Sequence, residues 1–372
     1  MHVYQRLLRP LLFRFDPEYV HRLVLRAGQM AGSIAPGRAA LQSLHGYEHA
    51  SLRTQLAGLN FANPVGLPAG FDKNGIAPQA LAAIGFGLID IGSVSLLPSA
   101  GNPLRPRLFR LPADDGIMVY YGVPNDGIEC VARRLATLRL QVPLGLSLVE
   151  TNTGVPASVD SVIAELVAAA RVARKVSDYR VLNLNCPNSG GGFSHFDDPA
   201  HLRALLQAMQ EVEREGRVFL RMSPPRDPAL IDTLLDAIDP FPFVKGIGFY
   251  MFPADLATRL KTPLVARERM RGSFSGPANR VATEEAIRQW YARIDRSRLV
   301  LIGVGGIFSA EDAYRSIRLG ASLVQVYTAL IYRGPGVVGE IKRGLVRLLA
   351  RDGLASVAEA VGVDCPQGRR EY

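Results

Sequence analysis

The chain has 372 residues, of which 48% are hydrophobic and 21% are charged, as in a soluble globular protein of one large domain or two ordinary ones. The net charge of +9 comes from basic residues scattered over many segments, and no aromatic–basic repeat accompanies them, which argues against nucleic acid as a partner. Cys130, Cys186 and Cys365 share no metal-ligand spacing, so the sequence predicts no metal site and indicates a reducing compartment.

Residues 1–32 form an N-terminal extension with two amphipathic segments. Between Met1 and Phe15, leucines recur at helical spacing beside arginines, and Asp16-Pro17 then supply the cap and first-turn proline of a second helix that runs to about Met30. Such helices either pack on the main domain or lie in the surface of a bilayer, and composition favours neither. No apolar run reaches the ~18 residues of a membrane span, and the basic N-terminus lacks the apolar core of a signal peptide.

Residues 54–372, which follow a linker at 33–53, alternate between strand-like and helix-like segments. The predicted strands are 64–70, 87–95, 143–149, 180–186, 217–223, 244–250, 299–304 and 322–327. The predicted helices are 162–176, 199–216, 228–238, 283–294 and 310–319, with a closing helix pair at 337–360. Eight strands that alternate with helices fit a closed (β/α)8 barrel, an α/β fold. A doubly wound open sheet is the competing fold, but the Gly-x-Gly-x-x-Gly signature expected after its first strand is absent.

The most polar of these strand ends follows residues 181–184. Asn183, Asn185 and Asn188, together with Cys186, place three amides and one thiol at a single rim, and Pro187 with the glycines ends the strand abruptly. In a barrel, the carboxyl ends of the strands are where active sites are built. A turn rich in Asn and Gly is the alternative explanation. The seven other predicted strands also end in polar or glycine-rich residues, which favours a functional site.

Glycines and cations at other strand ends indicate an anionic ligand. Gly305 and Gly306 end the seventh strand and Gly276 precedes it, where exposed backbone N–H groups commonly hold a phosphate in barrels. Lys73 and Arg221 add two positive charges at the ends of the first and fifth strands. The alternatives are a tight turn and two solvated charges. The apolar strand residues directly beside both cations favour the binding interpretation.

With these residues, the chain resembles the class 2, quinone-linked dihydroorotate dehydrogenases, which are FMN-containing (β/α)8 barrels. The resemblance extends nearly end to end and is carried by residues 12–21 (LFRFDPEYVH), 63–75 (NPVGLPAGFDKNG), 101–111 (GNPLRPRLFRL), 302–307 (IGVGGI) and 320–328 (GASLVQVYT). It implies one barrel domain that carries an N-terminal helical extension.

The resemblance implies that FMN contacts residues at the strand ends. These are Ala69, Gly70, Lys73, Ser93, Ser147, Asn183, Arg221 and Tyr250, with the phosphate on Gly276, Gly305, Gly306, Tyr327 and Thr328. Two positions differ from the family, whose lysine under the flavin is Arg221 here and whose strand-three asparagine is Ser147. Arginine keeps the positive charge that stabilises reduced flavin, but it cannot lose a proton as lysine can.

The resemblance also implies that the N-terminal helix pair forms a tunnel through which a membrane quinone reaches the flavin. The histidine, arginine and tyrosine of the family fall on His21, Arg107 and Tyr327. His21 alone would be explained by a structural role, but the presence of all three residues favours the tunnel. The implied location is the cytoplasmic side of the inner membrane, with the protein held peripherally.

The substrate side departs from the family, which binds orotate with four asparagines and a barrel lysine. Lys73, Asn183 and Asn188 remain, whereas Val119 and Met251 replace two of the asparagines. Each buried polar group left unpaired costs ~1–3 kcal/mol, so two lost amides predict weak binding of orotate.

Three other substitutions change the same pocket. Phe252, beside Met251, adds aromatic bulk, and Glu150 places an acid where the family has a base. Cys186 replaces the catalytic serine of class 2 enzymes, a choice otherwise seen in class 1 enzymes. A thiolate is a competent base when its pKa is lowered, and Lys73 is placed to help.

We therefore expect an FMN-dependent enzyme that oxidises a related but less polar ring and passes the electrons to quinone, with Cys186 removing a proton. A genuine dihydroorotate dehydrogenase with an unusual pocket is the first alternative. A non-catalytic FMN-binding paralogue is the second.

Overall fold

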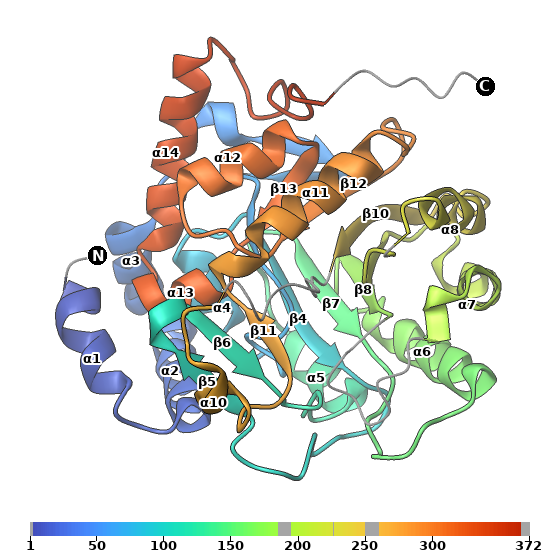
Figure 1. Ribbon diagram of the computed structural model, residues 1–372, viewed down its shortest axis with the longest axis horizontal. Helices are drawn as coiled ribbons and strands as arrows, with labels where there is room; N and C mark the ends of the chain where they lie inside the picture. The colour runs from blue at the N-terminus through green and yellow to red at the C-terminus, as the bar shows by residue number, and fades with distance from the viewer. Residues whose placement is uncertain (1–2, 185–194, 226, 250–259, 366–372) are drawn as a thin grey trace.

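The computed structural model describes residues 3–184, 195–225, 227–249 and 260–365, and its centre is a closed barrel of eight parallel strands (Figure 1). In chain order these are β3 (Val65–Leu67), β4 (Leu88–Val94), β7 (Leu144–Leu148), β8 (Tyr179–Asn183), β9 (Val218–Met222), β10 (Val244–Phe249), β12 (Val300–Val304) and β13 (Ala321–Gln325). Each strand pairs with the next in this order, and β13 closes the ring against β3. All eight strands predicted from the sequence are confirmed, and so is the (β/α)8 fold.

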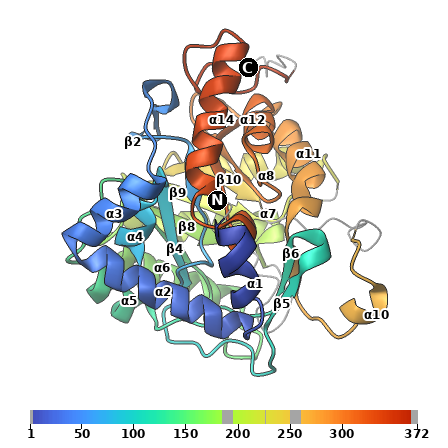
Figure 2. The same cartoon turned by 90° about the vertical axis from the view of Figure 1, so that its left-hand side faces the viewer.

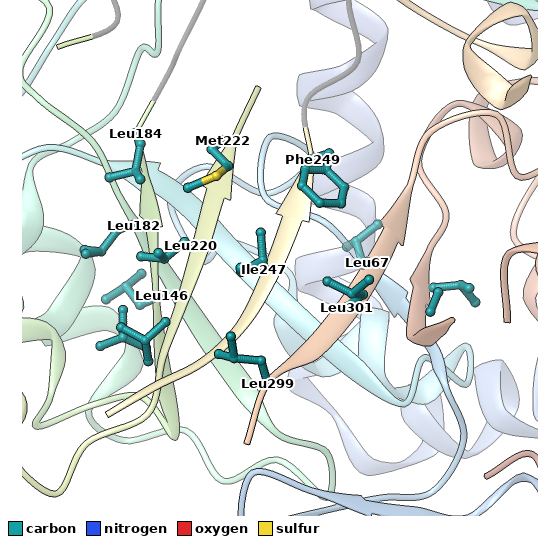
Figure 3. Packing of buried hydrophobic residues seen from close by; sticks show 14 of the residues in the cluster. Leu67, Leu146, Leu182, Leu184, Leu220, Met222, Ile247, Phe249, Leu299 and Leu301 are labelled. Atoms are coloured by element: carbon teal, nitrogen blue, oxygen red, sulfur yellow. The ribbon is translucent and has the colours of Figure 1, made fainter. Parts of the chain in front are cut away.

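Successive side chains of a strand point to opposite faces, so the barrel has two apolar layers, one outside the ring of strands and one inside it. Outward-facing Leu146, Leu182, Leu220 and Ile247 belong to the large cluster that includes the surrounding helices (Figure 3). A smaller cluster fills the interior, with Leu88, Tyr179, Phe219, Ile302 and Leu323 packed beneath the carboxyl end of the strands. The barrel is therefore a packed core, and only its carboxyl end is left for a ligand.

The helices that cover the barrel include all five expected from the sequence (Figure 1). They are α6 (Val159–Ala173), α7 (Pro199–Glu213), α8 (Leu230–Ile238), α11 (Arg280–Tyr291) and α12 (Ala310–Arg318); α5 (Ile128–Leu135) also lies among them. The expected closing helix pair is wrong, because residues 337–360 contain one helix, α14 (Val337–Arg351), followed by turns. Gly353 adopts a left-handed φ of 71° just past its end, a conformation that commonly terminates helices.

The N-terminal extension lies along one side of the barrel (Figure 2). It comprises a π-helical turn at Tyr4–Leu8, α1 (Arg9–Leu12), α2 (Pro17–Ser33) and α3 (Ala35–His45). The segment expected as a linker at 33–53 thus contains a helix. Gly32 lets α2 approach α4 (Pro78–Ala83) closely, since an added Cβ would lie 2.7 Å from the Ala80 nitrogen. Within the described residues, no helix has the length and apolar character to cross a membrane.

Two small antiparallel sheets supplement the barrel and were not expected from the sequence. The hairpin β1 (Thr54–Leu56) and β2 (Leu59–Phe61) adds Phe61 to the interior cluster. The other sheet orders β11 (Ser273–Ser275), β6 (Gly116–Val119) and β5 (Leu108–Leu111), with Ser273 opposite Val119. Residues of this second sheet form part of the cavity described next.

Candidate active site

A cavity at the carboxyl end of the barrel brings together nine of the site residues expected from the sequence. They are Ala69, Gly70, Lys73, Ser93, Val119, Asn183, Arg221, Gly305 and Tyr327. The remaining wall includes Tyr121, Val123, Ser273, Phe274, Ser275 and Asn279. Residues more than 200 positions apart in the sequence thus meet, because every barrel strand ends at the same rim.

A hydrogen-bonded chain of small polar side chains forms the floor of this cavity. The Asn183 amide donates to the Ser93 hydroxyl over 2.9 Å, and Ser93 bonds Ser147 over 2.8 Å. All three side chains are buried. The Oδ1 atom of Asn183 has no hydrogen-bond partner among the described residues. Because Asn183 lines the cavity, this oxygen is a ready acceptor for a ligand N–H group.

Lys73 and Arg221 supply the positive charge of the site. The Lys73 ammonium donates to the Gly70 carbonyl over 2.7 Å and lies 4.1 Å from the centre of the Tyr121 ring. Burial lowers the pKa of Lys73 to about 8, against the opposing attraction of Asp72. Arg221 donates from Nη1 to the Gln325 amide oxygen over 2.9 Å and is 6% exposed. The two cations of the cavity thus come from β9 and from the loop that follows β3.

The glycines expected to hold a phosphate lie in the loops that follow β11 and β12. Gly305 and Gly306 adopt φ values of 110° and 74°, a region in which side chains are strained. At Gly306 an added Cβ would lie 2.5 Å from the Arg280 Cα atom, so only glycine fits. The hydroxyl of Ser275, next to Gly276, bonds that of Thr328 over 2.6 Å. Of the residues expected to hold phosphate, Gly305 and Tyr327 line the cavity, and Gly276, Gly306 and Thr328 are sequence neighbours of lining residues.

A second, largely apolar cavity runs between α2 and the barrel. Its walls include Val20, His21, Leu25, Leu81 and Leu330, with Tyr121 and Tyr327 shared with the first cavity. The two spaces therefore meet at a pair of tyrosines. The side chain of Phe71 meets that of Tyr327 edge to face, with the ring centres 6.0 Å apart. Aromatic side chains thus lie between this space and the first cavity.

His21 is held in a defined tautomer at this boundary. Its Nε2 atom donates to the Phe71 carbonyl over 2.7 Å, because a carbonyl oxygen can only accept. Burial, followed by the nearby charge of Lys73, lowers the pKa of His21 to about 3. The imidazole is therefore neutral at physiological pH.

Arg107 is buried beside α2 but is not among the residues that line the apolar cavity, where Arg110 lies instead. Arg107 pairs with the buried carboxylate of Glu18 and donates to the carbonyl of Ala100 over 2.8 Å. It thus anchors the extension to the barrel. Cys186, Asn188, Tyr250, Met251 and Phe252 lie outside the described residues.

Comparison with known proteins agrees with this architecture. The family model described as dihydroorotate dehydrogenase matches residues 51–349. The chain belongs to the dihydroorotate dehydrogenase family.

Curated relatives of this family match over nearly the full chain. A protein of Deinococcus deserti named dihydroorotate dehydrogenase (quinone) is 35% identical, covering 97% of this chain and 100% of the relative. One of Sphingopyxis alaskensis with the same name is 38% identical, covering 96% of both. Among solved structures, that of Eimeria tenella DHODH in complex with ferulenol has a TM-score of 0.77 and 26% identity, covering 94% of this chain and 96% of that one. The chain is thus an oxidoreductase of the dihydroorotate dehydrogenase type.

Several residues of this dehydrogenase-family site were not expected from the sequence. Tyr121 borders both cavities, and its hydroxyl is buried without a partner among the described residues. Glu18, which follows the expected helix start at Asp16-Pro17, pairs with Arg107. Gln325 and Asp90 lie inside the barrel, in strands that read as apolar runs. A polar residue at an inward position of such a strand is the signal that could have identified them.

Proposed function

We propose that this chain binds FMN and oxidises dihydroorotate to orotate, with a membrane quinone as electron acceptor. The observation that carries the proposal is the junction of two unlike cavities at Tyr121 and Tyr327. One cavity combines amide, hydroxyl and cationic groups with apolar side chains, and the other is almost wholly apolar and lies beneath α2. A polar donor and an apolar acceptor would thus approach one cofactor from different sides. The names of the relatives, dihydroorotate dehydrogenase (quinone), support both partners.

The residues of the polar cavity fit FMN. Asn183 offers an unpartnered amide oxygen, Ser93 and Ser147 offer hydroxyls, and Arg221 offers a fixed positive charge. The backbone of Gly276, Gly305 and Gly306, with Thr328 and Tyr327, would hold the phosphate. FMN would supply the acceptor for two electrons from the substrate carbon. Arg221 would face the ring as a permanent cation, since a guanidinium keeps its proton at any physiological pH.

The substrate groups have named roles in this proposal. Lys73, a cation at pH 7, would pair with the substrate carboxylate, and Asn183 and Asn188 would bind its ring. Cys186 would remove the proton from the carbon next to the one that gives up hydride, which general-base catalysis accelerates by roughly 10²–10⁴-fold. The product then carries a carbon–carbon double bond, and the quinone becomes a quinol. These roles follow from the family positions of the residues.

The extension supports a membrane location. Exposed apolar side chains on its outer surface include Leu7, Leu8, Leu11, Phe15, Tyr19 and Leu23, and arginines lie among them. Such a surface suits the boundary between lipid headgroups and acyl chains. We propose that it rests on an anionic bilayer at the cytoplasmic side of the inner membrane and admits quinone from there.

A less polar ring is the second candidate substrate, and one observation favours it. Val119 and Val123 line the polar cavity and carry no side-chain hydrogen-bonding group. The less polar ring was the first expectation from the sequence. The names of the relatives support dihydroorotate better.

Steady-state assay of the purified holoenzyme tests the proposal. With dihydroorotate as donor and a short-chain ubiquinone analogue as acceptor, we expect orotate and quinol to form in equal amounts. Orotate absent from the products, in a protein that carries FMN and reacts with quinone, would favour the second candidate.

A further inference from the structure

A line of buried hydrogen bonds connects Arg221 with the interior of the barrel. Arg221 Nη1 donates to Gln325 Oε1 over 2.9 Å, and Gln325 Nε2 donates to Asp90 Oδ2 over 2.6 Å. The Tyr179 hydroxyl donates to the other Asp90 oxygen over 2.5 Å. No member of the line is more than 6% exposed. The four side chains come from β9, β13, β4 and β8.

Glycines on the intervening strands leave the space for this line. An added Cβ at Gly145 in β7 would lie 2.4 Å from Asp90 Oδ1 and 2.3 Å from the Tyr179 ring. At Gly66 in β3 it would lie 3.3 Å from Gln325 Cγ and 2.6 Å from the Leu88 side chain. A side chain at Gly145 would therefore displace the carboxylate. The inward positions of these strands thus accommodate the polar line within an otherwise apolar interior.

The donor directions fix the chemical form of each group. Both Asp90 oxygens accept a hydrogen bond, one from a phenol and one from an amide, which suits an ionised carboxylate. Gln325 must then turn its carbonyl oxygen towards Arg221 and its NH2 group towards Asp90. Burial raises the pKa of Asp90, while the bonds from Tyr179 and Gln325 and the charge of Arg221 oppose this.

Other charges near the line face elsewhere. Arg180, on the opposite face of β8, pairs with Glu213 of α7, and Asp178 precedes Tyr179 at the start of the strand. The groups that face Asp90 are thus Tyr179, Gln325 and Arg221, with glycine at the nearest positions of β3 and β7. Asp90, the acid of this line, reaches the Arg221 guanidinium through Gln325, and its charge opposes that of Arg221.

We infer that Asp90 is a positioning residue that, together with Gln325, fixes the orientation of Arg221 and offsets its charge, and so sets the reduction potential of bound FMN. The inference rests on the FMN-binding part of the proposed function and is independent of the electron donor. A neutral residue at position 90 would leave the charge of Arg221 less balanced. The more negative, reduced form of the cofactor would then be favoured.

The test is the midpoint potential of the FMN-loaded protein, measured by dye equilibration with an enzymatic reductant and without dihydroorotate. Asp90→Asn keeps the size of the side chain and should raise the equilibrium constant for two-electron reduction on the order of tenfold, about 30 mV. Tyr179→Phe removes one bond to the carboxylate and should raise it roughly threefold, about 14 mV.

A matched pair on the outside of the molecule provides the control. The Tyr314 hydroxyl donates to Asp352 over 2.9 Å, so Asp352→Asn and Tyr314→Phe remove the same groups far from the cavity. Neither should change the potential. Potentials of Asp90→Asn and Tyr179→Phe equal to wild type would overturn the role of Asp90. If Asp90→Asn does not fold, Tyr179→Phe decides alone, while a wild-type protein that takes up no FMN overturns both this inference and the proposed function.

Discussion

The two sides of the active site differ in how completely they keep the pattern of the family. On the tunnel side, His21 and Tyr327 line the apolar cavity, while Arg107 lies outside its lining and pairs with Glu18. On the substrate side, Val119 stands in the cavity wall where the family resemblance places an asparagine. The half of the site that would hand electrons to quinone is thus more complete than the half that would recognise the donor. The identity of the electron acceptor and the identity of the electron donor can therefore be tested independently.

The largest expected effect concerns the donor half alone. Cys186→Ala should slow reduction of the bound FMN by substrate by roughly 10²–10⁴-fold, because the general base is lost. Reoxidation of chemically reduced enzyme by quinone should not change, since that step needs no base at this position. Stopped-flow absorbance resolves both steps. Cys186→Ser, which restores the hydroxyl of the class 2 family, is the matched variant and should keep activity. Unchanged reduction by substrate in Cys186→Ala would remove Cys186 from the mechanism.

Deletion of residues 1–32 should damage the acceptor half alone. If α2 covers roughly 100 Å² of the quinone, its loss costs about 2.5 kcal/mol, or roughly 60-fold in kcat/KM for quinone. Binding to anionic vesicles should disappear as well. Turnover with a soluble dye acceptor is the control, and it should persist because the barrel and the polar cavity remain. Equal quinone kinetics before and after truncation would show that the apolar cavity is not the quinone route.

The charge of Lys73 should make donor binding dependent on pH. Because burial lowers its pKa to about 8, Lys73 is mostly cationic at pH 7 and mostly neutral at pH 9. The dissociation constant of orotate should therefore be flat below pH 8 and rise by up to about tenfold per unit above it. Titration of the flavin spectrum with orotate at several pH values measures this. In Lys73→Met binding should be weak at every pH, and a wild-type profile that stays flat to pH 10 would argue against the ion pair.

A smaller effect, tighter binding of orotate, is expected when an asparagine of the family is restored on the substrate side. Val119→Asn restores one amide, and a hydrogen bond contributes about 1–1.5 kcal/mol, so orotate should bind roughly 5- to 12-fold more tightly. Val123→Asn introduces the same group at another position of the cavity wall and is the matched control. If Val119→Asn weakens orotate binding, the natural donor does not place a polar group beside this position.

Regular periodicity made the barrel predictable, since β4, β7 and β9 are short apolar strands between amphipathic helices. The rim residues followed from the rule that active sites lie at the carboxyl ends of barrel strands. What the sequence did not reveal depends on contacts between distant segments. The pairing of Glu18 with Arg107 spans 89 positions, and that of Asp90 with Gln325 spans 235. No local pattern encodes such a partner.

The α3 helix was missed for a different reason. Its segment contains Pro36 and Gly37, which are typical of a linker, but Pro36 lies in the first turn, where proline is tolerated. In place of the expected second closing helix, the residues that follow Gly353 form turns. Both errors come from glycine and proline, whose effect depends on their position in the element.

Whether dihydroorotate is the electron donor is decided by anaerobic mixing of the FMN-loaded protein with dihydroorotate. We expect flavin absorbance near 450 nm to be lost in a single turnover, with orotate formed in equal amount, and the dihydroorotate concentration for half-maximal rate to fall in Val119→Asn. Flavin that stays oxidised at saturating dihydroorotate, yet is bleached by dithionite and reoxidised by quinone, would contradict this expectation.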